Sequence, residues 1–298
     1  MFLAACDNED EAVSTNPMDY PAEIHGAIKG YTADGTTRTD GAVWAEGAAI
    51  GVTTAAGISK ISYVMTDDRN VKYVYNTEKA TFQVASKEGE DHNIYFKGPY
   101  TMNMTAYAPY TGERGILAGV IQASTTSGKQ VGAARASIDF LYAEGGGSQT
   151  NPRVDFQFFH KMSQLVLSFK AGGGLELGDI SYTLKNIILD GSFDTSAGSV
   201  ALGKTVGNIE MALVKSNEMN SSVIVFPQRL TSNLLLELAM GGKTYAEPIG
   251  NSIDLASGST YVFDVTIAPQ AMTISPAKIE DWIWGENSDH YVIAGESE

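Results

Sequence analysis

Four histidines are the first residues to test for chemistry, because imidazole can move protons and can bind metals. They are His25, His92, His160 and His290, far apart in the sequence, and no His-Glu-x-x-His or His-x-His spacing occurs. No Gly-x-Ser-x-Gly elbow is present to expose a serine nucleophile. We therefore expect structural or surface histidines, no metal or organic cofactor, and no enzymatic activity.

The sequence Gly241-Gly242-Lys243-Thr244 ends like a phosphate-binding loop. That motif needs a first glycine at position 237, where Glu237 stands, and a strand–loop–helix context. Strand-like segments flank the glycine pair instead, over 234–239 and 244–248. This arrangement favours a tight β-hairpin over a nucleotide site.

Acidic and tryptophan residues could serve a sugar-processing or sugar-binding site. A glycosidase needs two carboxylates placed across the substrate, and a chain with 35 acidic residues offers too many pairs for any one to be informative. Trp44, Trp282 and Trp284 could stack on sugars, although core or sandwich-end positions are the commoner role of such residues.

The charge balance argues against nucleic-acid binding. The chain has 298 residues with 20 basic and 35 acidic side chains, a net charge of −15, and no Lys/Arg cluster. Such a chain repels phosphate backbones. The same net charge favours solubility at a surface.

The single cysteine, Cys6, lies in Leu3-Ala4-Ala5-Cys6 and is followed by an acidic run over 7–11. This pattern is typical of a bacterial lipobox, in which the cysteine receives lipid chains that anchor the protein. Only five residues precede Cys6, fewer than the basic and apolar regions of a signal peptide require. The alternatives are a chance Leu-Ala-Ala-Cys and a merely solvated acidic tether. We predict lipidation at Cys6, with 1–21 as signal remnant and leader.

The rest of the chain contains strand patterns separated by turn signals, and no clear amphipathic helix. The expected strands of the first half are 23–31, 49–53, 60–64, 72–75, 81–84, 94–96, 102–107 and 138–142. Those of the second half are 162–170, 181–189, 199–202, 223–226, 234–239, 244–248, 261–267 and 272–274. The Gly-rich stretch 143–152, ending in Pro152, is the predicted domain boundary. We expect an all-β protein of two sandwich domains in tandem, 22–147 and 148–298.

The segment Glu23–Tyr31 alternates in the manner of a half-buried strand. Ile24, Gly26, Ile28 and Gly30 would point inward, and the residues between them outward. Two glycines make this inner face weak for a core strand, since an interior glycine costs about 0.5–1 kcal/mol relative to alanine.

Landmarks spread over most of the chain resemble the fimbrillin family, the subunits of type V pili. They are Thr37-Arg38-Thr39 followed by Trp44, Gly47 and 50–52, then 93–96, 105–110, 139–143, 159–165, 225–228, 258–261 and 274–282. Each landmark is weak alone, and their order behind a lipobox is more specific.

The resemblance implies two transthyretin-like Greek-key β-sandwich domains and an outer-membrane lipoprotein of the cell surface and fimbrium. It also implies cleavage between Arg38 and Thr39 by a trypsin-like protease, and head-to-tail strand exchange with other pilin subunits. The displaced strand would be that of Ile24, Gly26, Ile28 and Gly30. Tyr291, Val292, Ile293 and Ala294 form a short candidate donor strand. An adhesive subunit would additionally bind host or bacterial surface ligands.

Three alternatives stay open on the sequence alone. Arg38 could be an ordinary exposed arginine in a loop of small residues, where proteases cut in any case. The chain could instead be a glycan-binding surface lipoprotein of a nutrient-uptake system, which needs clustered exposed aromatics, or a hydrolase, which needs converging acids.

Overall fold

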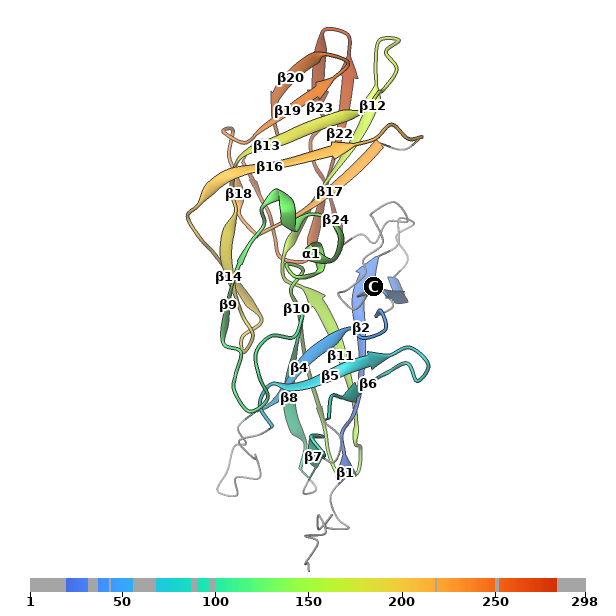
Figure 1. The fold of residues 1–298 in the computed structure, drawn as a ribbon, viewed down its shortest axis with the longest axis vertical. Coiled ribbons are helices and arrows are strands. Elements are labelled where there is room, and N and C mark those ends of the chain that lie inside the picture. The colour runs from blue at the N-terminus through green and yellow to red at the C-terminus, as the bar shows by residue number, and fades with distance from the viewer. Residues whose placement is uncertain are drawn as a thin grey trace, which may run out of the picture.

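We describe residues 20–31, 37–42, 44–55, 68–86, 90–96, 100–217, 219–249 and 252–282 in a computed structural model (Figure 1). The fold is almost entirely β, as predicted from the turn-punctuated strand patterns. Two β-rich units follow one another along the long axis of an elongated molecule (Figure 1).

The first unit is built on a single sheet that closes on itself. Its strands are β2 (Glu23–Tyr31), β3 (Thr37–Ala42), β4 (Ala49–Thr54), β5 (Val71–Asn76), β6 (Thr81–Val84), β8 (Met102–Ala108), β10 (Leu141–Gly147) and β11 (Arg153–His160). They follow the order β11-β10-β8-β4-β5-β6-β2-β3, and β2 also pairs with β11. A short pair, β1 (Tyr20–Pro21) with β7 (Tyr95–Phe96), lies at one end.

Closure through β2 differs from the predicted pair of separate sheets. Strands β4 and β5 run across the direction of β10 and β11, as two layers would (Figure 1). The pairing of β2 with both β6 and β11 then joins the layers edge to edge. The enclosed core is rich in aromatic residues, with Trp44, Tyr73, Phe82, Phe156 and Phe158 all buried.

The second unit is a sandwich of two sheets. One sheet has the order β17-β12-β22-β23, with β24 also paired to β22, and the other has the order β16-β13-β19-β20. The first contains β12 (Ser163–Ala171), β17 (Met219–Val225), β22 (Ser259–Ala268), β23 (Ala271–Ile274) and β24 (Lys278–Asp281). The second contains β13 (Ile180–Ile188), β16 (Val206–Leu213), β19 (Leu235–Met240) and β20 (Lys243–Pro248). Their inward aliphatic residues form one continuous core.

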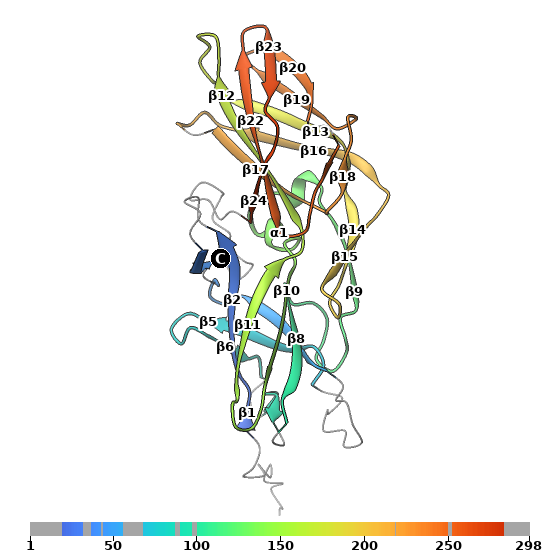
Figure 2. The ribbon, with the colours of Figure 1, turned by 180° about the vertical axis from the view of Figure 1, so that it is seen from behind.

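A further group of short strands and helices lies alongside both units. The strands β9 (Val120–Ser124), β14 (Asp190–Asp194) and β15 (Ser199–Leu202) form a small sheet (Figure 2). The short helices η1 (Ser127–Lys129) and α1 (Gly132–Ala136) follow β9, and β18 (Arg229–Leu230) pairs with β21 (Ile253–Asp254). Buried residues from these parts and from both units, among them Phe140, Met162, Phe193, Phe226 and Trp282, form a separate junction core.

The Gly-rich stretch 143–152 does not separate the two units, although the boundary was predicted there, between residues 147 and 148. Gly145 and Gly147 belong to β10, and residues 148–152 turn the chain back into β11 of the same sheet. The chain passes into the second unit after His160, where β12 begins at Ser163. Glycine is needed inside β10 because a Cβ on Gly147 would lie 2.5 Å from Cζ of Phe96. The glycines therefore mark close approach of rings to a strand.

Candidate strand-exchange site

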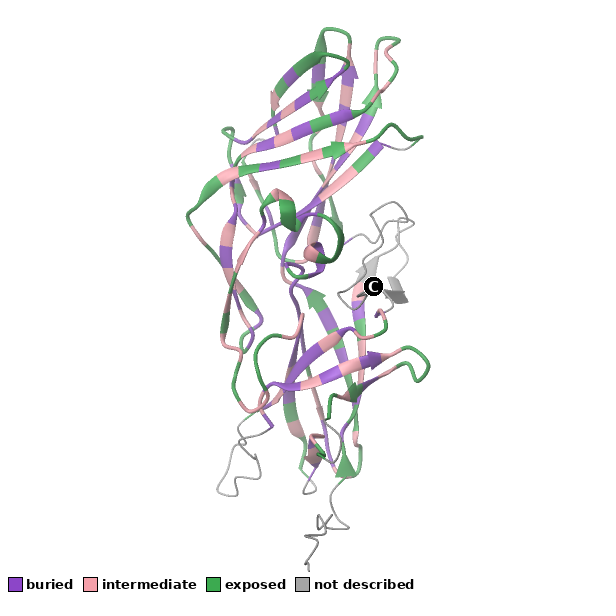
Figure 3. Ribbon diagram, in the orientation of Figure 1, coloured by how far each residue is buried: buried purple, intermediate pink, exposed green. Residues whose placement is uncertain are grey.

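Strand β2 contributes the residues of its inner face to the core of the first unit. Ala22, Ile24 and Ile28 are buried, while Glu23 and Ala27 are exposed. This alternation is the predicted one, and it follows from the two-residue period of a strand (Figure 3). Removing β2 would open the core along one side.

The main backbone partner of β2 is β11. The two strands run parallel and in register from Glu23 opposite Arg153 to Ile28 opposite Phe158, side by side in Figure 2. On its other side β2 pairs with β6 only at Ile24 opposite Phe82, and with β3 over its last residues. Departure of β2 would thus turn β11 into an edge strand with unpaired peptide groups, which is a template for another strand.

Gly26 lies at the centre of β2 and against aromatic rings. The indole Nε1–H of Trp44 donates a hydrogen bond to the Gly26 carbonyl oxygen over 3.0 Å. Trp44 also packs edge-on against Phe82 and Phe158, with ring centroids 5.1 Å apart in each pair. The rings fill the space that a side chain at position 26 would need.

The outer face of β2 carries polar residues against β11. His25 lies opposite Asp155, and Asp155 accepts a two-point ion pair from Arg153 with nitrogen–oxygen distances of 2.7 to 2.9 Å. Partial burial, and then the positive charge of Arg153, lower the pKa of His25 below its usual value. Further along, the Lys29 ammonium lies 5.4 Å from the centroid of the exposed Phe159 ring.

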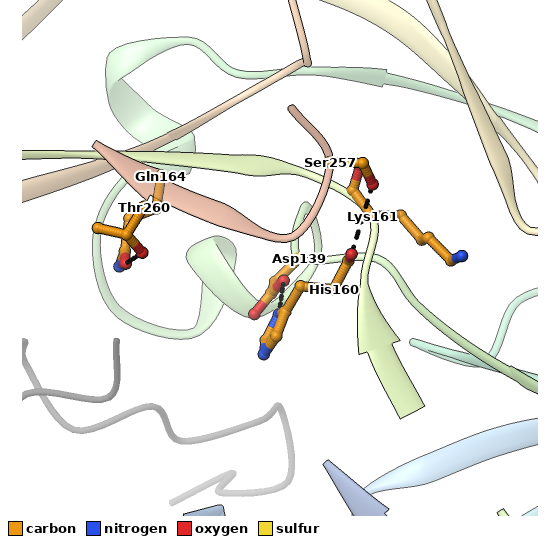
Figure 4. Close-up of polar contacts among 6 residues, drawn as sticks. All are labelled: Asp139, His160, Lys161, Gln164, Ser257 and Thr260. Atoms are coloured by element: carbon orange, nitrogen blue, oxygen red, sulfur yellow. Dashed lines mark hydrogen bonds and ion pairs between the residues drawn. The ribbon is translucent and has the colours of Figure 1, made fainter. Parts of the chain in front are cut away.

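The end of β2 faces the junction between the units. His160 Nδ1 lies 2.7 Å from Asp139 Oδ1, and both side chains are almost fully buried (Figure 4). The His160 ring stacks on Trp282 at 4.1 Å with an angle of 5° between the rings. The stack anchors Trp282, which directly follows β24, in the junction core.

Serine and threonine hydroxyls donate hydrogen bonds next to this stack, where the chain enters the second unit. Ser257 donates to the Lys161 carbonyl over 2.9 Å, and Thr260 donates to Gln164 Oε1 over 2.8 Å (Figure 4). A cleft of about 380 Å³ lies beside them, lined by Lys29, Phe159–Lys161, Ser257–Ser259, Asp281 and Trp282. The cleft is therefore lined both by Lys29 of β2 and by Asp281 and Trp282 at the end of β24.

The predicted processing site lies in a strand. Arg38 and Thr39 belong to β3, where Arg38 pairs with Gly30 and Thr37 with Tyr31. Among the described strands β3 pairs only with β2, so it is an edge strand. Cys6 and Tyr291, Val292, Ile293 and Ala294 lie outside the described residues.

The other motifs considered for chemistry have structural places. Gly241 and Gly242 form the turn of the β19–β20 hairpin with φ of 58° and 77°, which favour glycine. His92 lies 2.7 Å from Glu90 at the surface. Within the described ranges no three His, Cys, Asp or Glu side chains are grouped to hold a metal ion. No helix there is long and apolar enough to span a membrane.

A closed all-β unit is thus followed by a β-sandwich, and β2 closes the first unit by pairing with β11, β6 and β3. A model of the fimbrillin-like family matches residues 37–282, and the chain belongs to that family. The matched span begins at Thr37, the first residue of β3, and ends at Trp282, so β2 lies before it.

Individual relatives support the same family. A Bacteroides uniformis protein called "Putative fimbrium subunit Fim1C" is 24% identical, covering 96% of this chain and 92% of its own. The structure of a "putative cell adhesion protein" from Bacteroides ovatus is 33% identical, with a TM-score of 0.82 over 90% of this chain and 99% of that one. A second structure, from Bacteroides uniformis, shares the fold at 22% identity and a TM-score of 0.65, covering 88% and 99%.

These findings establish a fimbrial subunit of the cell surface that is structural and non-enzymatic, as the sequence indicated.

Proposed function

We propose that this chain is a fimbrial subunit that polymerises by exchanging β2 for a strand of another subunit. The observation that carries the proposal is the position of β2. This strand closes the sheet of the first unit, and its covalent connection to the residues after it runs through β3. A single peptide-bond cleavage after Arg38 would leave β2 bound by non-covalent contacts alone.

Those contacts are strong enough to protect the intact subunit from assembling early. Burial of Ile24 and Ile28 contributes about 1.5–3 kcal/mol each, and pairing with β11 satisfies the peptide groups along six residue pairs. The covalent tether also keeps β2 at an effective concentration of about millimolar order. An untethered competitor cannot match that advantage.

Cleavage removes the tether and leaves the groove unchanged. Trp44, Phe82 and Phe158 all follow Arg38 in the sequence, so the lining of the groove stays with the cut subunit. A donor strand then gains the same ladder on β11 and the same pockets. Each subunit gives one strand and receives another, and such a head-to-tail contact builds an open filament.

The position of Arg38 fits a trypsin-like protease. Proteases of this kind bind an extended backbone, and β3 supplies an extended edge strand that pairs with β2 alone among the described strands. The cut would fall next to an irregular part of the β2–β3 ladder. Gly30 pairs with Arg38 and Ile28 with Ala42, and the register shifts between these two pairs.

Export as a lipoprotein anchored through Cys6 completes the proposal. The lipobox-like sequence before Cys6 and the acidic run after it support delivery to the outer membrane. Mass spectrometry of protein extracted from native membranes should find a lipid-modified cysteine at position 6. An unmodified peptide that runs through Cys6 would contradict the anchor.

The test of strand exchange uses a trypsin-like protease and light scattering. Wild-type protein should be cut at Arg38 and then grow in mass, while the Arg38→Ala variant should stay monomeric under the same treatment. Arg229→Ala is a matched control, since it removes an exposed arginine in β18, which does not pair with β2, and it should polymerise like wild type.

If wild type is cut at Arg38, loses β2 and never oligomerises, even with other fimbrial subunits present, strand exchange is wrong for this protein. A variant that ends at residue 290 separates the two roles of the subunit. It should be cut normally but should not polymerise by itself, because it lacks the candidate donor Tyr291–Ala294.

A further inference from the structure

The groove that holds β2 contains a site at Gly26 where no side chain fits. A Cβ built on Gly26 would lie 2.9 Å from Cε2 of Phe82 and 3.0 Å from Cε2 of Phe158. The backbone at Gly26 is not in the left-handed region, so its φ would admit any residue. The restriction is therefore one of space alone.

The two rings cannot easily move aside, because each is held by further rings. Phe82 packs edge-on against Tyr75 as well as Trp44, with centroids 5.1 Å apart in both pairs. Phe158 packs against Phe156 at 5.9 Å as well as against Trp44. All five rings are buried, so a shift at either contact must pass along the row.

Trp44 adds a constraint on the main chain at the same point. Its indole N–H is satisfied by the Gly26 carbonyl oxygen at 3.0 Å. If β2 leaves, that buried donor loses its partner, which costs stability until another carbonyl takes the position. The site thus requires a carbonyl oxygen and rejects a side chain, and a glycine in an extended strand meets both requirements.

We propose that Trp44, Phe82 and Phe158 form a glycine-selecting pocket that fixes which strand of another subunit can enter the groove and in which register. This inference rests on the proposed strand exchange and names the partner chemistry: an apolar strand with a β-branched or aliphatic residue two positions from a glycine. Ile24 precedes Gly26 by two residues, and Ile28 follows it by two.

A second copy of this chain carries such a sequence near its C-terminus. Gly295 follows Ile293 by two residues, as Gly26 follows Ile24. The pocket assigns Gly295 to the position of Gly26, which places Ile293 in the site of Ile24 or, in the opposite strand direction, of Ile28. The candidate donor therefore extends one residue beyond Ala294.

The pocket is tested first in the intact chain. Gly26→Leu should lower the denaturant midpoint, whereas Ala27→Leu, one residue away on the exposed face, should leave it close to that of wild type. Replacing Phe82 by leucine removes the ring carbon nearest to position 26. Gly26→Leu should therefore cost less in a Phe82→Leu background than in wild type. Equal effects at positions 26 and 27 would overturn the inference.

Strand selection is tested with protein cut at Arg38 and labelled nine-residue peptides of the sequence 22–30. The wild-type peptide should bind, a peptide with leucine at position 27 should bind within about 3-fold of it, and a peptide with leucine at position 26 should bind at least 10-fold more weakly. A 287–298 peptide should bind, and its Gly295→Leu variant should not.

The outcomes separate this inference from the proposed function. Failure of the wild-type peptide and of the 287–298 peptide to enter the cut subunit would overturn strand exchange, and strand selection with it. Binding of both, with equal affinity of the position-26 leucine peptide, would leave strand exchange standing and overturn the pocket. Loss of binding by both leucine variants, at positions 26 and 27 alike, would also contradict the pocket.

Discussion

His25 is the one histidine on the strand proposed to leave, and its lowered pKa predicts that the binding of β2 depends on pH. Burial and Arg153 lower its pKa, while Asp155 and Glu23 act in the opposite direction more weakly. A lowered histidine pKa means that the folded state binds fewer protons than the unfolded state. The contribution of neutral His25 to the stability of the folded state is thus fully present above the ordinary histidine pKa of about 6.5. It is lost as the pH falls through the lowered pKa of His25.

We therefore expect protein cut at Arg38 to release β2 faster at about pH 5 than at about pH 7.5. Size-exclusion chromatography with mass detection of the released fragment measures this rate. The variant His25→Gln should show a smaller difference between the two pH values. An unchanged difference would assign the pH effect to other groups.

Trp282 is a residue whose role the sequence left open between sugar stacking and anchoring. In the structure its ring lies on His160 within the junction core, with an exposed fraction of 1%. Burial on this scale favours the anchoring role. Trp282→Ala should lower the free energy of unfolding by about 3–5 kcal/mol in urea titrations. A change below about 1 kcal/mol would show that the stack contributes little to stability.

The inward residues of β2 were predictable, but the reason for Gly26 was not. Alternation alone assigns Ile24, Gly26, Ile28 and Gly30 to one face. In the structure Ile24 and Ile28 are buried, and a Cβ at Gly26 would point at Phe82 and Phe158. The sequence alone indicated that Gly26 weakens β2 and so eases release of this strand. Contacts with Phe82 and Phe158 come from distant parts of the chain, so only the folded structure shows that the glycine fits a crowded site.

At the scale of elements, β11 is one of several strands that the sequence prediction missed, and it is the main backbone partner of β2. Strand β11 alternates cleanly, with Val154, Phe156 and Phe158 buried and the residues between them exposed. The period was visible in the sequence. It was overlooked because the preceding Gly-rich stretch and Pro152 were interpreted as a linker, whereas those residues form strand interior and a hairpin.

The glycines of β10 give a direct test of that correction. Gly147→Val would place side-chain atoms against Phe96 and Val154, where even a Cβ is 2.5 Å and 3.0 Å away. Overpacking of this kind should cost about 1–3 kcal/mol in denaturant titrations. Gly128→Val, at a position with open space around it, is the control and should change stability by less than about 0.5 kcal/mol. Equal effects of the two substitutions would favour a linker.

At the scale of the whole molecule, the all-β class followed from patterning, while the closure of the first sheet did not. Closure depends on β2 meeting β11 in parallel, a pairing between residues 23–28 and 153–158 that no local signal encodes. The same long-range pairing makes the first unit complete only while β2, or a strand that replaces it, is present. The cores of the second unit and of the junction contain no residue of β2.

The mass of the subunits inside the polymer tests the central claim most directly. Protein treated with a trypsin-like protease should form polymers, which are then isolated and denatured for mass spectrometry. We expect subunits that begin at Thr39, with the fragment that contains β2 absent from the polymer and present in the supernatant. Polymers that retain this fragment in equal amount, or that form as readily from uncut Arg38→Ala protein, would contradict exchange of β2 as the basis of assembly.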